Sequence, residues 1–198
     1  MIKKTPYIIS LLVIIALAWY YFIFSAFPIS LGFINAVTAF SATIIISFSF
    51  FLGPLAKFIN FFRKHLEYRK QFGFIGYSLA ALHILLVVPL LLEETQEIVF
   101  ADVVSIAVAA AAFILFTLMA FTSTPKWLEK LGYENWKNLQ RTGYVALIFV
   151  LIHITLLEKG IFLTRTTGQI AISLILITII LRTLTLVFRM QSKDKITL

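Results

Sequence analysis

The chain alternates between long apolar segments and short segments that are rich in basic residues. Six segments are almost free of charge: residues 7–24, 34–53, 72–92, 103–122, 142–158 and 168–188. Helices of about 17 to 21 residues are long enough to cross a hydrocarbon core of about 30 Å. The one charged side chain near the end of the last segment, Arg182, is long enough to reach the membrane interface. The pattern predicts an all-α polytopic membrane protein, a six-transmembrane-helix bundle.

Composition agrees with this prediction and narrows the chemistry. The chain has 61% hydrophobic and 13% charged residues, whereas soluble domains average about a quarter charged. No linker rich in Gly and Ser divides it, so we expect a single transmembrane domain over residues 1–198. The first apolar segment is longer than a signal peptide's core, and we expect it to be retained as a helix. Cysteine is absent, which excludes disulfides, thiolate catalysis and Cys-ligated iron–sulfur clusters.

The net charge of +8 is explained by orientation in a membrane. If the N-terminus is cytoplasmic, all but two of the 17 Lys and Arg residues lie on the cytoplasmic side, the exceptions being Lys159 and Arg165. The loop after the third segment is instead acidic, with Glu93, Glu94, Glu97 and Asp102. We therefore predict an N-in/C-in bundle whose first partner is membrane lipid, and no nucleic-acid partner.

Two long loops, residues 54–71 and 122–141, are expected on the cytoplasmic side. Both mix aromatic with basic residues. In the second loop a Ser/Thr cap candidate precedes Pro125, and Trp127, Leu128 and Leu131 follow at near-helical spacing. One interpretation is that both loops anchor the protein at the lipid headgroups. The other is a basic, aromatic platform for a flavin phosphate or a soluble electron donor.

Two of the three histidines occupy matching positions inside apolar segments. GFIGYSLAALH covers residues 73–83 and GYVALIFVLIH covers residues 143–153, so both begin with glycine and end with histidine. In an N-in bundle the third and fifth helices run in the same direction. The helical rise from Lys70 and Arg141 then places the rings of His83 and His153 at one depth, about 18 to 20 Å above the inner boundary. Ionisable side chains are costly at that depth and are usually buried against a partner or serve a function.

The chemistry best suited to two histidines at one depth is haem ligation. Zinc takes three or four protein ligands, and a proton relay normally includes acidic residues, whereas haem iron needs only two axial ligands. Gly76 and Ala146, two turns inward on the same helix faces, would leave room for the macrocycle. We predict one haem with His83 and His153 as its axial iron ligands. The alternative is that each histidine bonds a Ser or Thr on a neighbouring helix; His65, among charged residues, is expected at the surface.

Two stretches carry a resemblance to a known family: the lead into LAALH, and the later segment LMAFTSTPKWLEKLGYENWKNLQRTGYVALIFVLIH. Over residues 69–158 the chain resembles the ferric-reductase-like transmembrane domain family. In size and pattern the chain is similar to the haem-binding subunit of the bacterial methionine sulfoxide reductase system, the MsrQ (YedZ) family. The resemblance implies a b-type cytochrome of the bacterial inner (plasma) membrane, with haem b at His83 and His153. Electrons would come from a cytosolic flavin reductase or quinol, directly or through a flavin such as FMN. They would pass to a periplasmic molybdopterin reductase that repairs oxidised methionine.

The sequence departs from the resembled family at one position. Family members often carry a further histidine in a W-x-x-L-H pattern, where this chain has Gln140, and the counterpart near Lys70 is not histidine either. One haem therefore fits better than two. Arg69, Lys70, Lys137 and Arg141 lie at the inner ends of the two histidine-bearing helices and could neutralise a flavin phosphate. The positive-inside rule is the competing explanation for these four residues.

We predict no catalytic residue in the chain, because the chemistry at the far end of the electron path would belong to a partner. The protein is expected to be an electron-transfer subunit rather than a complete enzyme. Two other functions stay open at this point. One is a self-contained ferric or oxygen reductase, and the other is a haem-free transporter or scaffold.

Overall fold

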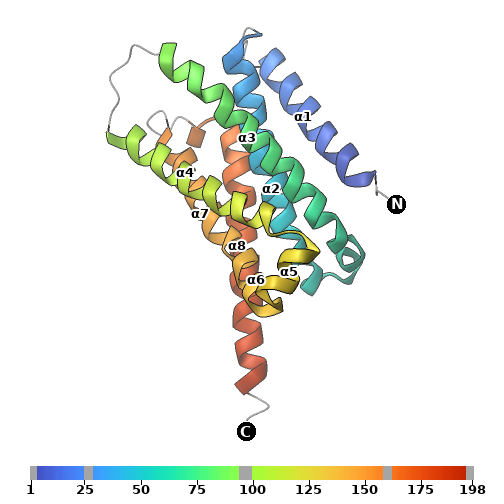
Figure 1. The fold of residues 1–198 in the computed structure, drawn as a ribbon. Coiled ribbons are helices and arrows are strands. Elements are labelled where there is room, and N and C mark those ends of the chain that lie inside the picture. Colours follow the sequence, from blue (N-terminus) through green and yellow to red (C-terminus); the bar gives the residue numbers. More distant parts are fainter. Residues whose placement is uncertain (1–3, 25–28, 94–99, 158–161, 195–198) are drawn as a thin grey trace.

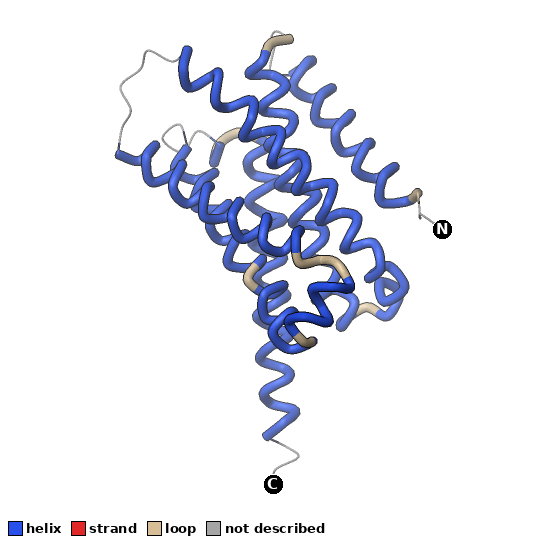
Figure 2. The backbone as a smooth tube through the Cα atoms, in the orientation of Figure 1, coloured by secondary structure: helices blue, strands red, loops and turns tan. Residues whose placement is uncertain are grey.

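The computed structural model describes residues 4–24, 29–93, 100–157 and 162–194. Their helices are α1 (Thr5–Phe24), α2 (Leu31–Phe58), the 3-10 helix η1 (Asn60–Tyr68), α3 (Arg69–Glu93), α4 (Phe100–Phe121), α5 (Pro125–Leu131), α6 (Tyr133–Arg141), α7 (Gly143–Leu156) and α8 (Thr166–Asp194). The described residues include no strand (Figure 2). Within them, six helices are long and apolar enough to cross a membrane. The predicted all-α, multi-pass architecture is confirmed (Figure 1).

Several helices are longer than the apolar segments that predicted them. Helix α2 begins at Leu31, where the Ser30 hydroxyl accepts a hydrogen bond from the Phe33 amide, and it continues to Phe58. Helix α8 runs to Asp194, and its last turns project from the bundle (Figure 1). Hydropathy marks where a helix leaves the hydrocarbon, whereas backbone hydrogen bonding continues through the polar turns beyond it. The predicted ends at residues 53 and 188 were therefore too early.

The segments predicted as two long loops are mostly helical. Residues 54–71 comprise the last turn of α2, the helix η1 and the start of α3, and residues 122–141 contain α5 and α6. Pro125 opens α5 as expected, although the Thr124 side chain makes no capping hydrogen bond. Gly132, with φ +72°, separates α5 from α6. None of the residues described in η1, α5 or α6 is buried, so these short helices lie on the surface.

One end of the bundle carries these surface helices, and we call it the basic end. Helices α2, α4 and α8 finish there, and α3 and α7 begin there (Figure 1). Most of the described Lys and Arg residues belong to these helix ends and to the surface helices. Arg165 lies at the opposite end, whereas Lys159, Glu94 and Glu97 fall outside the described residues. The separation of charge agrees with one end facing the cytosol.

Helix α2 is the central element of the bundle. It packs against α1, α3, α7 and α8, and most of its membrane-spanning stretch is buried. Small side chains on α2, among them Ser41, Ala42 and Ser47, are buried and permit close approach of its neighbours. On α3 the matching small residue is Gly76, where an added Cβ would overlap the Ile46 side chain. The α2–α3 contact therefore depends on small residues from both helices.

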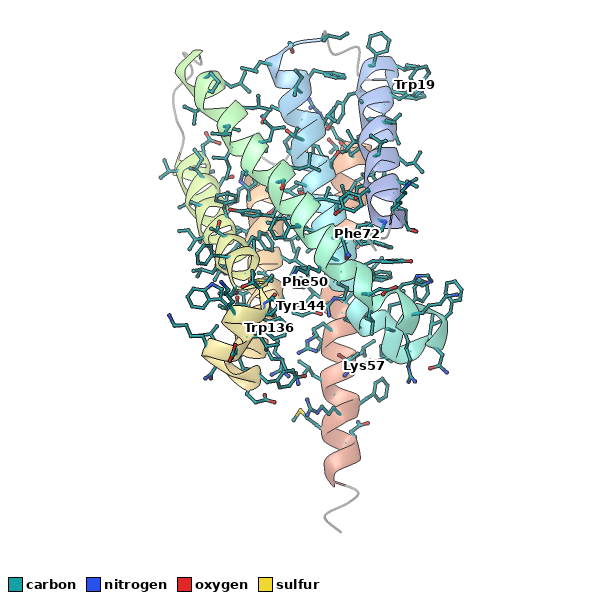
Figure 3. All side chains as sticks on the ribbon, turned by 45° about the vertical axis from the view of Figure 1, so that its right-hand side comes forward. Trp19, Phe50, Lys57, Phe72, Trp136 and Tyr144 are labelled. Atoms are coloured by element: carbon teal, nitrogen blue, oxygen red, sulfur yellow. The ribbon has the colours of Figure 1, made fainter. Side chains whose placement is uncertain are left out.

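Helices α4 and α7 form a second close pair, and aromatic rings fill the space between this pair and α2. Phe50 of α2 contacts the ring of Tyr144 at 5.2 Å between centroids (Figure 3). At the basic end, Trp136 Nε1 donates to the Thr122 carbonyl at 3.0 Å, and Gln140 Nε2 donates to the Met119 carbonyl at 3.2 Å. Gln140, which stands where the resembled family often has histidine, thus caps the last turn of α4.

Candidate functional site

The two histidines within the bundle come from helices that run in the same direction. His83 lies on α3 and His153 on α7, and both helices start at the basic end (Figure 1). Both side chains are partly buried. The two imidazoles are close enough to interact electrostatically. The two predicted residues therefore lie within electrostatic range of each other, one on α3 and the other on α7.

The orientation of His83 is set by a residue of α2. His83 Nδ1 lies 2.7 Å from Asn35 Oδ1. An amide oxygen can only accept a hydrogen bond, so Nδ1 carries the proton. The proton-free nitrogen is then Nε2, whose lone pair is available to a metal ion.

His153 is held in the same way by a residue of α4. His153 Nδ1 lies 3.1 Å from the Ser105 carbonyl oxygen and 2.9 Å from Ser105 Oγ. The hydroxyl can in turn donate to the His153 carbonyl at 3.2 Å. Because a carbonyl oxygen only accepts, Nδ1 is again the protonated nitrogen and Nε2 carries the lone pair. Ser105 is fully buried, so water does not compete for these bonds.

The two hydrogen-bonded pairs are related by an internal repeat. In each pair the polar residue and the histidine are 48 positions apart. Positions 35, 76 and 83 of the α2–α3 pair correspond, at a constant offset, to positions 105, 146 and 153 of the α4–α7 pair. Each half of the repeat therefore presents one oriented imidazole. Such an arrangement suits a ligand that is bound from two opposite faces.

The two small residues predicted beside the macrocycle lie at helix contacts. A Cβ added to Gly76 would meet Ile46 Cγ1 and would lie 3.3 Å from the Ala42 carbonyl oxygen on α2. Ala146 is fully buried within the main hydrophobic core. Close helix packing is therefore one physical reason for a small side chain at both positions. Their place beside a porphyrin stays a prediction.

Among the four basic residues predicted to neutralise a flavin phosphate, Arg69 turns into the bundle. Arg69 Nε donates to the Ser49 carbonyl of α2 at 2.9 Å, and Ser49 Oγ donates to the Arg69 carbonyl at 2.7 Å. The ionisable groups that interact with Arg69 are Tyr144 and Arg182. Its sequence neighbour Lys70 is exposed. Arg182, predicted only to reach the interface, thus joins Arg69.

The other two predicted basic residues make local contacts near α6. Lys137 Nζ lies 4.6 Å from the centre of the Tyr133 ring. Arg141 Nη1 donates to Asn138 Oδ1 at 2.8 Å. These contacts occupy both side chains at the surface of α6. A phosphate site made of all four predicted basic residues therefore stays a prediction without a contact that joins them.

His65 lies in a cluster of aromatic rings on η1. Its ring centroid is 5.1 Å from that of Phe61 and 5.4 Å from that of Tyr68. This cluster belongs to the surface of the basic end. The stated alternative, a Ser or Thr partner on a neighbouring helix, holds for His153, which bonds Ser105 of α4, whereas Asn35 as the partner of His83 was not predicted. The available signal was a polar residue near the start of each apolar segment that pairs with a histidine-bearing helix.

The nitrogen atoms of the two histidines fit a metal-containing ligand that itself supplies the other donor atoms around its metal. Among the residues that the structure describes, no group of three or more His, Cys, Asp or Glu side chains is placed to hold a metal ion. Two neutral imidazoles with free Nε2 atoms meet the needs of haem iron, whose four equatorial ligands are porphyrin nitrogens. The donor atoms are therefore of the kind that a bis-histidine haem requires, and the haem itself stays a prediction.

The fold defines a multi-pass membrane protein. Residues 32–151, more than half of the chain, match the family described as ferric reductase like transmembrane component, and the chain belongs to this family. The matched range includes Asn35, His83 and Ser105 and ends shortly before His153.

A curated relative is the magnetosome protein MamZ of Magnetospirillum gryphiswaldense. The two sequences are 33% identical over 93 residues, which is 46% of this chain and 14% of MamZ. The aligned part thus covers a small fraction of that much longer protein. The similarity supports a shared segment of sequence. It does not transfer the functions of the rest of MamZ to this chain.

Proposed function

We propose that this chain is a b-type cytochrome subunit that holds one haem b between α3 and α7. His83 and His153 would bind the iron through their Nε2 atoms. The observation that carries the proposal is that both Nδ1 atoms are engaged by acceptors on neighbouring helices. Metal-bound histidines are usually held in this way, which fixes the tautomer and the ring orientation. When bound, haem supplies one-electron redox chemistry.

The proposed direction of electron transfer is from the basic end to the opposite end. In the N-in/C-in orientation the basic end faces the cytosol, where a flavin reductase or a quinol would donate electrons, with or without a bound flavin. The haem would lie in the outer half of a bacterial inner membrane. Similarity to the MsrQ family favours a periplasmic molybdopterin methionine sulfoxide reductase as the acceptor.

The chain's own residues have two tasks in this function. Asn35 and Ser105 hold the imidazoles through Nδ1, which would leave Nε2 to bind the iron, and the surrounding apolar side chains would exclude water. Burial and hydrogen bonding to the axial ligands are two means by which a protein adjusts a haem potential. The proposal therefore assigns binding and adjustment of the potential to this chain, and the terminal reaction to its partner.

The test is an optical spectrum of the detergent-purified protein with haem and flavin quantification. We expect one haem per chain and the reduced α-band of a low-spin bis-histidine cytochrome. A preparation without a Soret band, even after haem supplementation, would support a haem-free transporter or scaffold instead. Rapid turnover of ferric iron or oxygen without any partner would support a self-contained reductase.

Asn35→Leu is expected to raise the midpoint potential of the haem. The Asn35 oxygen increases the basicity of His83 through Nδ1–H and so stabilises ferric iron. A net hydrogen-bond contribution of about 0.5 to 1.5 kcal/mol corresponds to a shift of about 20 to 60 mV for a one-electron couple. Ser105→Ala should shift the potential less, because the Ser105 carbonyl remains as an acceptor for His153. Spectroelectrochemical titration measures both shifts.

Two further variants separate this positioning role from general packing. Asn35→Asp keeps an acceptor for Nδ1–H, so its potential should lie at or below that of the wild type. Thr38→Val is a matched control one turn along α2, since the Thr38 hydroxyl bonds only backbone carbonyls of its own helix among its described contacts. A potential that moves equally in Asn35→Leu and Thr38→Val would contradict the positioning role of Asn35.

A further inference from the structure

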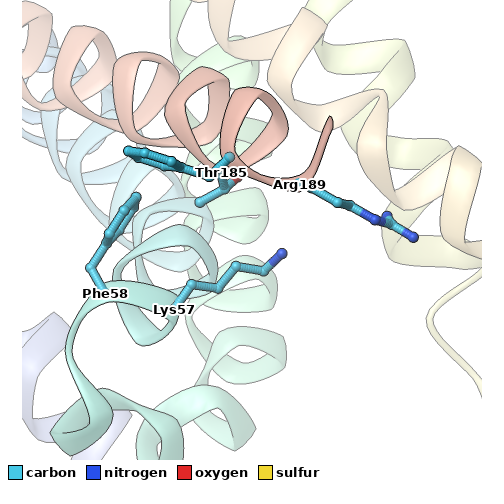
Figure 4. A pocket seen from close by; sticks show the side chains of 5 residues that line it. Lys57, Phe58, Thr185 and Arg189 are labelled. Atoms are coloured by element: carbon cyan, nitrogen blue, oxygen red, sulfur yellow. The ribbon is translucent and has the colours of Figure 1, made fainter. Parts of the chain in front are cut away.

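A line of four basic residues follows the seam between α2 and α8 at the basic end. We call it the basic seam; its members are Lys57, Arg69, Arg182 and Arg189. Helices α2 and α8 pack against each other there, with the Phe58 and Phe188 rings 6.1 Å apart. A cavity of about 300 Å³ opens in the seam (Figure 4). Its lining includes Lys57 from α2 and Arg189 from α8.

The inner part of the seam contains the guanidinium group of Arg69. This group lies against the backbone of Gly53, where an added Cβ would be 3.2 Å from both Cζ and Nη1. A glycine at position 53 therefore provides the space that the guanidinium occupies. Nε donates to Ser49, and among the described residues neither terminal amino group of Arg69 donates a hydrogen bond, so both can donate to a ligand.

Arg182 of α8 lies within electrostatic range of the Arg69 guanidinium. Its guanidinium lies 5.1 Å from the centre of the Tyr144 ring, and the Tyr144 hydroxyl donates to the Phe50 carbonyl at 3.3 Å. Arg182 and Arg69 interact as like charges. Within the described part of the chain, neither guanidinium is paired with a carboxylate. The described neighbours of these two cations, such as Ser49 and Tyr144, are therefore uncharged.

The helical repeat shows where Arg69 and Arg182 lie relative to the cavity. On α2, Lys57 lies one turn beyond Gly53, and on α8, Arg182, Thr185 and Arg189 share one face. Thr185 lines the cavity, so Arg182 lies one turn inward from it. The four cations therefore form one continuous strip that leads from the cavity into the bundle.

The positive-inside rule explains why basic residues gather at this end, but not why Arg69 and Arg182 both turn inward to the region of Tyr144. Partly buried like charges without a counter-ion are costly. An anion with several oxygen atoms would remove this cost, and guanidinium groups bind phosphate oxygens with bidentate geometry. Basic pockets between transmembrane helices on the cytoplasmic side are typical of phosphate headgroup binding.

We propose that the basic seam binds a phosphate group, with Arg182 and Arg69 as its principal ligands and Lys57 and Arg189 at its entrance. The phosphate can come from the headgroup of an anionic phospholipid or from a soluble phosphate monoester. Phe58 and Phe188 would contact an acyl chain in the first case and an aromatic ring in the second. The site does not depend on haem, since the rise of α3 separates Arg69 from His83 by about 20 Å.

The experiment uses the full chain in nanodiscs and compares ligands that differ only in the phosphate or its charge. In the soluble arm, FMN and riboflavin are titrated into phosphatidylcholine nanodiscs by fluorescence. In the lipid arm, the thermal stability in phosphatidylglycerol nanodiscs is compared with that in phosphatidylcholine nanodiscs. We expect a preference for the phosphate-bearing or anionic member in at least one arm, and the arm that shows it identifies the source.

Arg182→Gln is the main variant, because among the described contacts this side chain makes a ring contact and no hydrogen bond. It should reduce the preference about tenfold, the effect expected from the loss of one charge-assisted hydrogen bond. Arg69→Gln should act in the same direction but also removes the bond to Ser49, so Arg69→Lys accompanies it to retain the charge. Arg165→Gln is the matched control, since Arg165 lies at the opposite end of the bundle, where its guanidinium is 5.5 Å from the centre of the Phe162 ring.

The result that would overturn the proposal is a wild-type protein that treats FMN like riboflavin and phosphatidylglycerol like phosphatidylcholine. An equal loss of preference in Arg182→Gln and Arg165→Gln would overturn it as well, because the effect would then be general surface charge. The haem spectrum of each variant reports independently on folding. A protein without haem that still shows the preference would refute the proposed cytochrome and leave the phosphate site intact.

Discussion

Replacement of either His83 or His153 by alanine is expected to abolish the low-spin bis-histidine spectrum of the bound haem. Haem iron takes two axial ligands from the protein, and the bundle presents two oriented imidazoles for them. Loss of one ligand leaves the iron five-coordinate and high-spin, or releases the haem. Optical and electron paramagnetic resonance spectra of the purified variants measure this change.

Two comparisons make the histidine experiment specific. His65→Ala is the matched control, because that ring packs among Phe61 and Tyr68 on η1 and should leave the spectrum unchanged. In His83→Gly and His153→Gly, added imidazole should occupy the vacated space and restore the low-spin signal. A variant of either residue that keeps the full bis-histidine spectrum would refute its assignment as an axial ligand.

Gly76→Ala is expected to destabilise the protein by about 1 to 3 kcal/mol, the usual cost of overpacking a closely packed site. The added Cβ would overlap Ile46 Cγ1 and would lie 3.0 Å from the Ile46 backbone nitrogen, so α3 must move away from α2. Since Asn35 and His83 bridge the same two helices, the displacement should also weaken their hydrogen bond. Reversible unfolding in mixed detergent micelles measures the loss, and haem content reports its effect on the site.

Gly73→Ala provides the control for this substitution on the same helix. A Cβ at position 73 would meet Ser49 Oγ at 3.5 Å, an ordinary van der Waals distance, so stability should change little. The apoprotein separates two explanations of Gly76. If the residue served only to leave space for the porphyrin, Gly76→Ala would weaken haem binding without changing the stability of the haem-free protein.

The two proposed sites lie at different levels of the bundle and have different chemistry. The histidine pair is toward the ends of α3 and α7, among apolar side chains, and suits a ligand bound by neutral nitrogen atoms. The basic seam lies near the ends of α2 and α8 and suits an anion. A protein that moves electrons across a membrane needs a redox centre within the lipid and contact with a donor at one surface. The spacing of the two sites is consistent with that division.

The sequence alone determined the class of fold, and it predicts one common level for the two histidines. A hydrocarbon core of fixed thickness requires apolar segments of fixed length, so the six spans can be counted from hydropathy. The constant rise of a helix then converts residue numbers into depth, which is why His83 and His153 could be placed at one level. Helix ends were less predictable, because α2 and α8 continue through polar turns that hydropathy does not assign to the membrane.

Only the tertiary structure decided which side chains meet. Asn35 and Ser105 are distant in sequence from the histidines they orient, and their roles depend on α2 packing against α3 and α4 against α7. The same is true of Arg182, which joins Arg69 because α8 lies beside α2 at the basic end. Hydropathy and helical rise fix position along the membrane normal. The rotation of each helix about its axis and the identity of its neighbours depend on close packing at small residues such as Gly53, Gly76 and Ala146. No single segment specifies that packing.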